Sequence, residues 1–448
     1  MTKKEMDIFK FDTPYPLRDY QLEGVNFLFK NNNILLADEM GLGKTVQVAV
    51  TLNILCEEMP SFKSLIVVPS SLKINWFNEL QFWGKSLVVR KTTGGKGDRN
   101  IIINMPVNAS IVSYEDVRIQ YKDRSFDEKY NLIVFDEAQR IKNRGATAYL
   151  ACKALNSDRI WALTGTPIEN SRDDLISIFD IVEYGLIADY MAKVTIHEKI
   201  KYHFLRRIKT EVLSEIPPII EQEMSLEMRP NQQTSYNNVL FSKANEIHYG
   251  MNSISLFSII NALKQICNYD KYSNESIKLD TLEVILSDAF ESNKKVIIFS
   301  QYVKTLELIQ ERIKYNSVIY SGKLSEKNKD TVLNNFKKNK KINILLMSLK
   351  AGAVGLNIQE ADLVIIFDRW WNPQIENQAV NRAHRFGRNT NLHVIYFTVM
   401  NSIEERISQI LSEKREIFNE YIEQAESFKD LHIKDKIIEY LLKFKDEK

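Results

Sequence analysis

Short apolar runs separated by segments of helical length dominate the first part of the chain. The runs lie at residues 34–37, 65–69, 111–113, 132–135 and 160–163. Runs this short and this apolar are typical of strands that are buried on both faces. Strands that alternate with helices form a parallel sheet. We therefore expect a parallel α/β domain over residues 1–172.

A second series of the same kind follows later in the chain. Its runs lie at residues 295–299, 317–320, 344–347 and 363–367. The same argument predicts a second parallel α/β domain, over residues 287–414.

The stretch between the two series, residues 173–286, has apolar residues at helical spacing and few β-branched runs. We expect a helical insertion and linker there. Its basic residues Arg206, Arg207 and Lys209 fit either a phosphate-binding cluster or an ordinary charged helix face, and composition does not separate the two. Helical spacing returns at the end of the chain, which predicts a C-terminal brace with helices over residues 415–448.

The composition of the 448 residues is that of an ordinary soluble protein, with 44% apolar and 26% charged residues. The net charge is only +2, so a nucleic-acid surface would need local clusters of lysine and arginine. The three cysteines show no CxxC spacing, which argues against disulfide and zinc frameworks. No apolar run approaches the roughly 18 residues of a membrane span, and the N-terminus lacks the apolar core of a signal peptide. We expect a cytoplasmic protein without membrane contact.

Candidate chemistry begins where the first apolar run ends, in the sequence LADEMGLGKT. A glycine-containing turn over residues 38–43 delivers Lys44 and Thr45 to the start of a helical segment. Such a turn points backbone N–H groups at a phosphate. Lys44 would reach the outer phosphates of a nucleotide, and the Thr45 hydroxyl would ligate Mg²⁺. Asp38 stands where the usual pattern begins with glycine, so a glycine turn that happens to carry a lysine is the alternative.

Gln21 lies just upstream of this loop. Its amide offers one donor and one acceptor, which match N6 and N7 of adenine. An exposed helical glutamine is the alternative.

Two adjacent carboxylates, Asp136 and Glu137, follow the fourth apolar run directly. Their burial at the end of a strand is costly unless a cation or a reaction uses them, and ligands of parallel sheets bind at that end. Asp136 would hold Mg²⁺ through its water shell, and Glu137 would orient and deprotonate an attacking water. A solvated pair at a helix N-terminus is the alternative, but Lys44 and Thr45 earlier in the chain weigh against it.

The second domain lacks a phosphate loop of its own but carries arginines after its last apolar run. Gln378, Arg382 and Arg385 are spaced by four and three residues, which would place them on one helical face. Arg382 and Arg385 are either a solvated stripe or arginine fingers that neutralise a phosphate bound by the first domain.

The order of these motifs resembles that of the Snf2 family of superfamily 2 ATPases. The motifs are DEMGLGKT, DEAQ, LTGTPIEN, QICN, MSLKAGAVGLN and FDRWWNPQIENQAVNRAHRFGR. The resemblance extends from about Leu17 to about Lys414. It implies two RecA-like lobes with parallel sheets, a helical insertion and linker, ATP between the lobes and duplex DNA across both. Family members use hydrolysis to track along double-stranded DNA, and many displace bound proteins.

Site residues carried over from the resemblance fall into three groups. Nucleotide binding is implied for Gln21, Gly41, Gly43, Lys44, Thr45, Gly355 and Asn357, and Mg²⁺ binding for Thr45 and Asp136. Catalysis is implied for Lys44, Asp136, Glu137, Arg382 and Arg385. DNA contact is implied for Ser70, Asn75, Trp76, Ser113, Ser300, Gln301, Ser348, Lys350 and Trp371.

The chain departs from the family pattern at a few positions. Gln139 is the fourth residue of the DEAH-like box, which should affect coupling between the lobes more than chemistry. Tyr269 and Asp270 stand where His-Pro is usual, and Phe386 and Arg388 replace the usual residues of the last motif. None of these changes removes a catalytic group. The size resembles that of compact bacterial, archaeal or phage members.

We expect a monomeric ATPase that translocates on double-stranded DNA with ATP and Mg²⁺. A DNA-bound protein, or a replication, repair or transcription factor, is the expected kind of protein partner. A strand-separating helicase for DNA or RNA is one alternative. A non-catalytic scaffold that binds nucleic acid is another, although the complete set of catalytic side chains argues against it.

Overall fold

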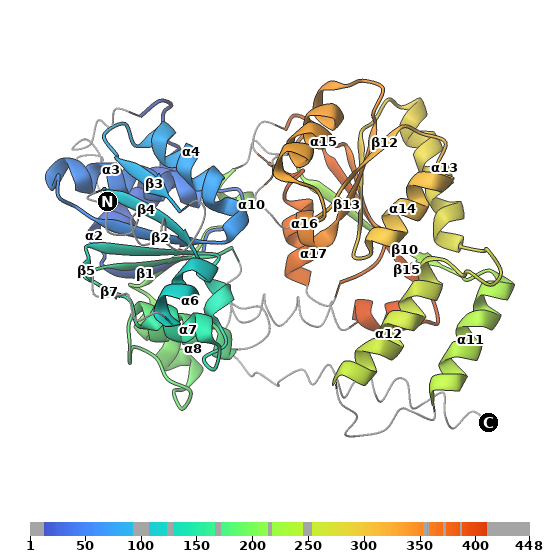
Figure 1. The fold of residues 1–448 in the computed structure, drawn as a ribbon, viewed down its shortest axis with the longest axis horizontal. Coiled ribbons are helices and arrows are strands. Elements are labelled where there is room, and N and C mark those ends of the chain that lie inside the picture. Colours follow the sequence, from blue (N-terminus) through green and yellow to red (C-terminus); the bar gives the residue numbers. More distant parts are fainter. Residues whose placement is uncertain are drawn as a thin grey trace. The chain divides into compact units, whose positions relative to one another are not determined.

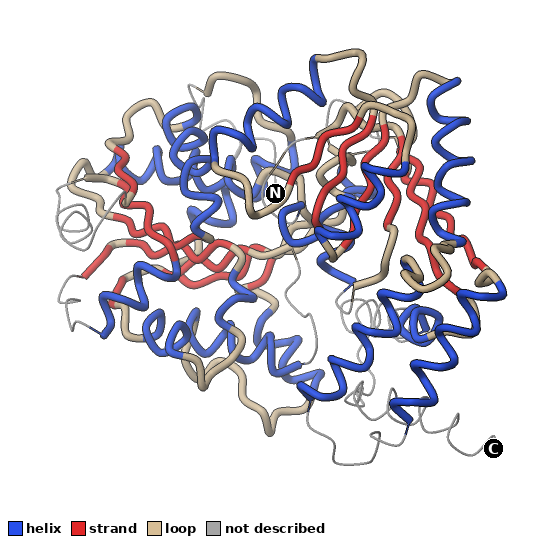
Figure 2. The backbone as a smooth tube through the Cα atoms, turned by 45° about the vertical axis from the view of Figure 1, so that its right-hand side comes forward, coloured by secondary structure: helices blue, strands red, loops and turns tan. Residues whose placement is uncertain are grey.

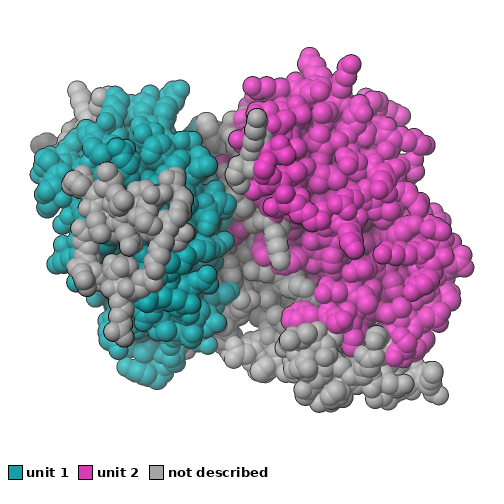
Figure 3. Space-filling view, viewed as in Figure 1, with its two compact units in different colours: residues 1–214 teal, residues 215–448 magenta. Residues whose placement is uncertain are grey.

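The computed structural model describes residues 13–409, apart from residues 93–106, 123–128, 166–171, 214–216, 245–252, 353–355, 357, 371–372 and 386–387. The chain forms two compact units, residues 1–214 and 215–448, which Figure 3 colours separately. Each unit contains a parallel sheet with helices on both faces (Figures 1 and 2). The predicted α/β class with two parallel sheets is confirmed.

The main sheet of the first unit has seven parallel strands in the order β3-β4-β2-β6-β8-β1-β9. Their bounds are β1 Asn33–Leu36, β2 Ser64–Val68, β3 Val89–Lys91, β4 Ala109–Ser113, β6 Leu132–Asp136, β8 Ile160–Leu163 and β9 Phe204–Leu205. Strands β2, β4 and β6 are buried along their whole length because helices cover both faces. This double burial explains why the sequence shows continuous apolar runs there. A separate short pair consists of β5 Lys129–Tyr130 and β7 Asn156–Ser157.

Ten helical elements accompany this sheet in the described part of the first unit. They are α2 Asp19–Lys30, α3 Lys44–Glu58, η1 Ser70–Leu72, α4 Lys73–Trp83, α6 Tyr114–Lys122, η2 Ala138–Ile141, α7 Thr147–Lys153, α8 Arg172–Val182, α9 Lys193–Ile200 and α10 Lys209–Val212. One core cluster joins Leu28 of α2, Leu52 of α3 and Trp76 of α4 to Ile66 of β2 and Val134 of β6. This packing fixes the loops that leave the carboxyl ends of the strands.

The sheet of the second unit has six parallel strands in the order β10-β15-β14-β11-β13-β12. Their bounds are β10 Ile219–Leu226, β11 Val296–Ser300, β12 Ser317–Tyr320, β13 Ile344–Ser348, β14 Leu363–Ile366 and β15 Leu392–Val399. The helices are α11 Pro230–Ala244, α12 Ser253–Asn268, α13 Ile277–Glu291, α14 Val303–Arg312, α15 Glu326–Lys338, α16 Leu349–Gly352 and α17 Pro373–Val380. Residues 403–409 are also helical.

The predicted helical insertion and linker over residues 173–286 also contains two strands that the sequence did not predict. Strand β9 joins the edge of the first sheet, and β10 joins the edge of the second. Most residues of β10 are exposed, so the strand has no apolar run to reveal it. The two-residue β9 is too short to show any periodicity.

The described beginning of the C-terminal segment packs as a brace would. Ile403 and Ile407 are buried against α11 and α12, in one cluster with Tyr236 and Leu263. The predicted helices over residues 415–448 lie outside the described residues. Within the described part of the chain, none of the helices combines the length and the apolar character that crossing a membrane requires.

Candidate active site

The predicted phosphate loop lies between strand β1 and helix α3. Gly41 and Gly43 have φ values of 91° and 78°, in the left-handed region that favours glycine because it has no Cβ. Gly43 is the N-cap residue of α3 and has no side chain that could cap the helix. The first N–H groups of α3, where Thr45 lies, are therefore suited to an anion.

Lys44 lies close to the predicted catalytic carboxylates. Its Nζ donates a hydrogen bond to the carbonyl oxygen of Asp38 at 2.6 Å. Desolvation lowers the pKa of Lys44, and the nearby carboxylates of Asp38, Glu137 and Asp136 act in the opposite direction. The structure thus brings together the two motifs that the sequence predicts to share one site.

Asp136 ends strand β6 and is held by three neighbours. Trp76 Nε1 donates to Asp136 Oδ2 at 2.7 Å, and the backbone N–H of Glu137 donates to Oδ1 at 3.0 Å. The Tyr114 hydroxyl donates to the Asp136 carbonyl oxygen at 2.8 Å. Burial, and then the negative charge of Glu137, raise the pKa of Asp136 to about 7. A carboxylate this poorly solvated favours a nearby cation.

Glu137 is the second residue of the pair and has a strained backbone. Its φ of 52° lies in the left-handed region, where residues with a Cβ are uncommon. Gln139 Nε2 donates to Glu137 Oε2 at 2.6 Å, and the Thr164 hydroxyl donates to Gln139 Oε1 at 2.7 Å. Gln139, which departs from the family pattern, therefore links the candidate base to the end of strand β8. The sequence does not reveal this role.

Gln21 lies against the phosphate loop. A Cβ atom at Gly43 would come within 2.6 Å of Gln21 Nε2. The Gln21 Oε1 accepts a hydrogen bond from the backbone N–H of Arg18 at 3.1 Å, which fixes the amide at the start of α2. This position fits the predicted contact with adenine.

The sequence did not decide between two roles for Arg207 and Lys209. Both residues are buried beside the loop. Arg207 is 7% exposed and forms a two-pronged ion pair with Asp38, and Lys209 is 4% exposed and pairs with Glu39 at 3.9 Å. Neither residue belongs to a solvated helix face. In the sequence, Asp38 was the feature that could have indicated a buried partner such as Arg207, because a carboxylate directly after a buried strand needs a buried cation.

The residues at this edge fit a magnesium ion that is shared with a nucleotide. Among the residues that the structure describes, no group of three or more His, Cys, Asp or Glu side chains is placed to hold a metal ion. Mg²⁺ commonly takes one or two protein oxygens together with phosphate and water oxygens. Each carboxylate oxygen of Asp136 accepts one of the two hydrogen bonds above and retains a lone pair, and Thr45 adds a hydroxyl.

Two family models match the chain over most of its length. The model described as SNF2-related domain matches residues 20–272, and the model described as helicase conserved C-terminal domain matches residues 277–387. The chain belongs to the SNF2-related family. The resemblance drawn from the motifs is confirmed.

Relatives of this SNF2-related chain include bacterial and plant proteins. Uncharacterized ATP-dependent helicases of Mycoplasma genitalium and Mycoplasma pneumoniae are each 33% identical, over 93% and 92% of this chain and 43% of each relative. Protein CHROMATIN REMODELING 5 of Arabidopsis thaliana is 30% identical, over 87% of this chain and 26% of its own length. The chain thus spans less than half the length of these curated relatives.

A solved structure similar to the SNF2-related chain is the Sulfolobus solfataricus SWI2/SNF2 ATPase core in complex with dsDNA. The two are 28% identical with a TM-score of 0.46, and the match covers 93% of this chain and 94% of that chain.

The DNA contacts implied for the first unit divide into exposed and buried side chains. Ser70 and Asn75 are exposed, one in η1 and one in the first turn of α4. Trp76 is buried and directed at Asp136, and Ser113 is buried and accepts a hydrogen bond from the backbone N–H of Asp116 at 3.0 Å. Direct DNA contact does not fit the burial of Trp76 and Ser113, whose side chains are engaged inside the unit.

In the second unit, two implied DNA-contact residues are buried as well. Ser300 is fully buried, and its hydroxyl donates to Asp368 Oδ2 at 2.5 Å. Ser348 is 6% exposed at the end of β13. The burial of both side chains does not fit direct DNA contact.

Gln301 lines a pocket of about 410 Å³ at this edge, together with Lys271 and Lys304. Its amide nitrogen is buried and has no hydrogen-bond partner among the described atoms. Such a donor beside two lysines is suited to an acceptor from a ligand such as a phosphate. Lys350 lies in α16. The other implied residues, Gly355, Asn357 and Trp371, lie outside the described residues.

The expectation that Arg382 and Arg385 share one helical face with Gln378 is wrong. Helix α17 ends at Val380, before both arginines. The carbonyl oxygen of Arg382 accepts a hydrogen bond from the N–H of Ile358 at 2.9 Å. Arg382 is buried and Arg385 is partly buried.

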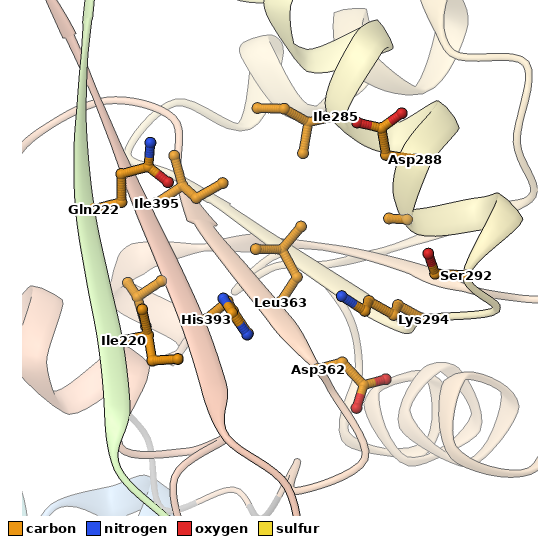
Figure 4. A pocket seen from close by; sticks show the side chains of 12 residues that line it. Ile220, Gln222, Ile285, Asp288, Ser292, Lys294, Asp362, Leu363, His393 and Ile395 are labelled. Carbon is orange, nitrogen blue, oxygen red and sulfur yellow. The ribbon is translucent and has the colours of Figure 1, made fainter.

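A second pocket, of about 250 Å³, lies at the other end of the same sheet (Figure 4). Residues at the amino ends of β10, β14 and β15 line it, with Asp288 and Ile285 projecting from helix α13. None of the predicted site residues lines this pocket. Ligands of parallel sheets bind at the carboxyl ends of the strands, so the candidate site lies elsewhere.

Proposed function

We propose that the chain hydrolyses ATP in response to double-stranded DNA and uses this energy to move along the duplex. The observation that supports the proposal is that Lys44, at the end of the glycine loop, is close enough to Asp136 and Glu137 for their charges to oppose the lowering of its pKa by burial. Phosphoryl transfer requires a lysine that binds phosphate, a carboxylate that binds a cation and a second acid, all at one edge of the sheet.

The first unit would bind the nucleotide. Gln21 would hold the adenine edge, while the N–H groups of α3 and the ammonium of Lys44 would bind the phosphates. Magnesium, held by Thr45 and Asp136, would supply neutralisation of the phosphate charge. Glu137 would align water and accept its proton, with its carboxylate positioned by Gln139.

Arg382 and Arg385 of the second unit would stabilise the charge that develops on the transferred phosphoryl group. Because the first unit supplies the loop and the acids, hydrolysis would depend on both units. DNA could then control turnover by controlling their association. Gly355 and Asn357 are further candidates for this step.

DNA would be held mainly through its phosphates. Ser70 and Asn75 in the first unit, and Gln301 and Lys350 in the second, are the contacts that we propose, with Trp371 as a further candidate. Binding of this kind falls steeply with salt and ignores base sequence. Proteins bound to the duplex, including replication, repair or transcription factors, would be displaced by the moving chain.

The decisive experiment measures phosphate release with duplex DNA, single-stranded DNA, RNA or no nucleic acid. We expect the duplex to stimulate release most strongly, and Lys44→Ala to remove the stimulation as a matched inactive control. Equal turnover under all four conditions would contradict the proposal.

Strand separation is the competing activity, and the Mycoplasma relatives are named ATP-dependent helicases. A forked duplex and a DNA triplex separate the two possibilities. We expect the chain to displace the third strand of the triplex and to leave the fork paired. Unwinding of the fork without triplex displacement would establish a helicase instead.

A further inference from the structure

The last strand of the first unit extends beside the phosphate loop. Strand β9 pairs in parallel with β1, and the N–H groups of Leu35 and Ala37 donate to the carbonyl oxygens of His203 and Leu205, both at 2.7 Å. The N–H of Glu39 donates to the carbonyl oxygen of Arg207 at 2.9 Å. The backbone ladder therefore continues past the strand into the start of the loop.

The Arg207 side chain joins three elements of the site. Its Nε donates to Asp38 Oδ1 at 2.9 Å and its NH2 to Asp38 Oδ2 at 2.5 Å. The same NH2 donates to Gln47 Oε1 at 3.0 Å in α3, and NH1 donates to the carbonyl oxygen of Tyr20 in α2. One guanidinium thus connects the adenine side, the loop and the helix that follows it.

These contacts lead directly to the groups that would meet phosphate. Gln47 Nε2 donates to Asp38 Oδ2 at 3.1 Å and to the carbonyl oxygen of Leu42 at 3.4 Å. Lys44 donates to the carbonyl oxygen of the same Asp38. Asp38 and Gln47 are fully buried, so water cannot replace a lost partner.

The network is closely packed on the side of helix α2. A Cβ atom at Gly24 would come within 1.7 Å of Gln47 Oε1 and 2.9 Å of Arg207 NH2. Helix α2 thus packs closely against both Gln47 and Arg207. A rigid arrangement of this kind transmits a small displacement to its neighbours.

We propose that Arg207 is a positioning residue for the nucleotide. It fixes Asp38 and Gln47, and through them the loop and Lys44, in the geometry that binds phosphate. It also fixes this loop relative to Gln21, which follows Tyr20 in the chain. The inference rests on the proposed function, because it names a residue that shapes the same ATP site.

Arg207→Lys tests the inference, because lysine keeps the charge but loses the two-pronged geometry. We expect the full chain with this change to bind ADP more weakly, on the order of tenfold by calorimetry. Arg369→Lys is the matched control, since Arg369 is 4% exposed and pairs with the buried Glu376 in the second unit at 3.2 Å. It should lower the unfolding temperature without changing ADP affinity.

Gly24→Ala provides a second route that leaves every charge in place. It should displace Gln47 and Arg207 and weaken ADP binding in the same direction, and it decides the question alone if Arg207→Lys does not fold. ADP affinity within about twofold of the unmodified chain in the folded variants, with only the unfolding temperature lowered, would overturn the inference.

The two proposals fail in different ways. The unmodified chain could bind ADP while duplex DNA does not stimulate phosphate release. That result would contradict the proposed function, but the ADP affinities of the variants would still test the positioning role of Arg207. If the unmodified chain does not bind ADP, both fall together.

Discussion

In both units, polar side chains lie at the carboxyl ends of the parallel strands, but the two edges are built differently. In the first unit the edge holds a glycine loop, a lysine with a lowered pKa and a carboxyl with a raised one. In the second unit, Lys278 and Glu404 are both fully buried and lie 2.6 Å apart. Lys278 Nζ also donates to Asn268 Oδ1 at 2.9 Å and to the carbonyl oxygen of Phe367 at 2.8 Å.

The buried charges of the two edges differ in whether hydrogen bonds within the protein satisfy them. The ammonium of Lys278 has three hydrogen-bond partners within the protein, which matches its three donors. Asp136 is buried beside another carboxylate, and its environment disfavours its own charge. The buried lysine of the second edge is thus satisfied within the protein, whereas the buried carboxyl of the first edge is not.

The largest effect that we expect is on chemistry at the first edge. Glu137→Gln should reduce DNA-stimulated phosphate release by roughly 10³- to 10⁴-fold, because the amide cannot accept the proton of water. ADP affinity should persist, since the change keeps the shape of the side chain. A loss of less than about tenfold would show that another group acts as the base.

The corresponding change at the second edge should affect folding and not chemistry. Lys278→Met leaves Glu404 buried and unpaired, which should destabilise the second unit by about 3–5 kcal/mol in thermal or denaturant unfolding. ADP binding by the first unit should change by less than about twofold. Lys314→Met serves as the control, because the Lys314 pair with Glu283 is exposed and should leave the unfolding temperature unchanged.

A smaller effect concerns the hydrogen bond from Trp76 to Asp136. Trp76→Phe keeps most of the ring but removes the N–H donor, and a hydrogen bond to a charged group contributes about 1.5–3 kcal/mol. We expect turnover at limiting Mg²⁺ to fall by roughly 10- to 100-fold and to recover partly at high Mg²⁺. Trp83→Phe is the control, because Trp83 donates to Glu79 at 3.0 Å away from the site. Equal losses in the two variants would remove this role from Trp76.

The last expected effect is a gradual dependence of stability on pH. The folded pKa of Asp136 is raised to about 7, above the usual value of a carboxyl, so the folded chain binds more protons than the unfolded chain below that pH. Without ligand, stability should therefore fall as pH rises from 5 to 7, by at most about 1.4 kcal/mol per pH unit from this group. Asp136→Asn should flatten the slope, measured as the unfolding temperature across this range. An unchanged slope would show that other groups determine it.

Much of the fold and of the first edge follows from the sequence. The apolar runs that became β1, β2, β6 and β8 are buried on both faces, so their pattern needs no partner to be recognised. Lys44 follows such a run after a six-residue turn, the Asp136–Glu137 pair follows one directly, and the carboxyl ends of parallel strands share one edge.

The remainder depends on pairing between distant residues. Strands β9 and β10 become strands only because β1 and β15 offer them an edge. Arg207 belongs to the site through Asp38, and Trp76 through Asp136, and neither spacing nor composition records these pairs. Ser113 and Ser300 show the converse, since motif position predicts a surface role while packing places both side chains inside.

The pairing of Arg207 with Asp38 also constrains how the chain can be made. The two residues are 169 positions apart, so during synthesis the loop leaves the ribosome long before its guanidinium partner exists. Until residue 207 emerges, the nascent unit carries Asp38 without the cation that its burial requires. We therefore expect the nucleotide site to reach its final geometry only when the first unit is nearly complete.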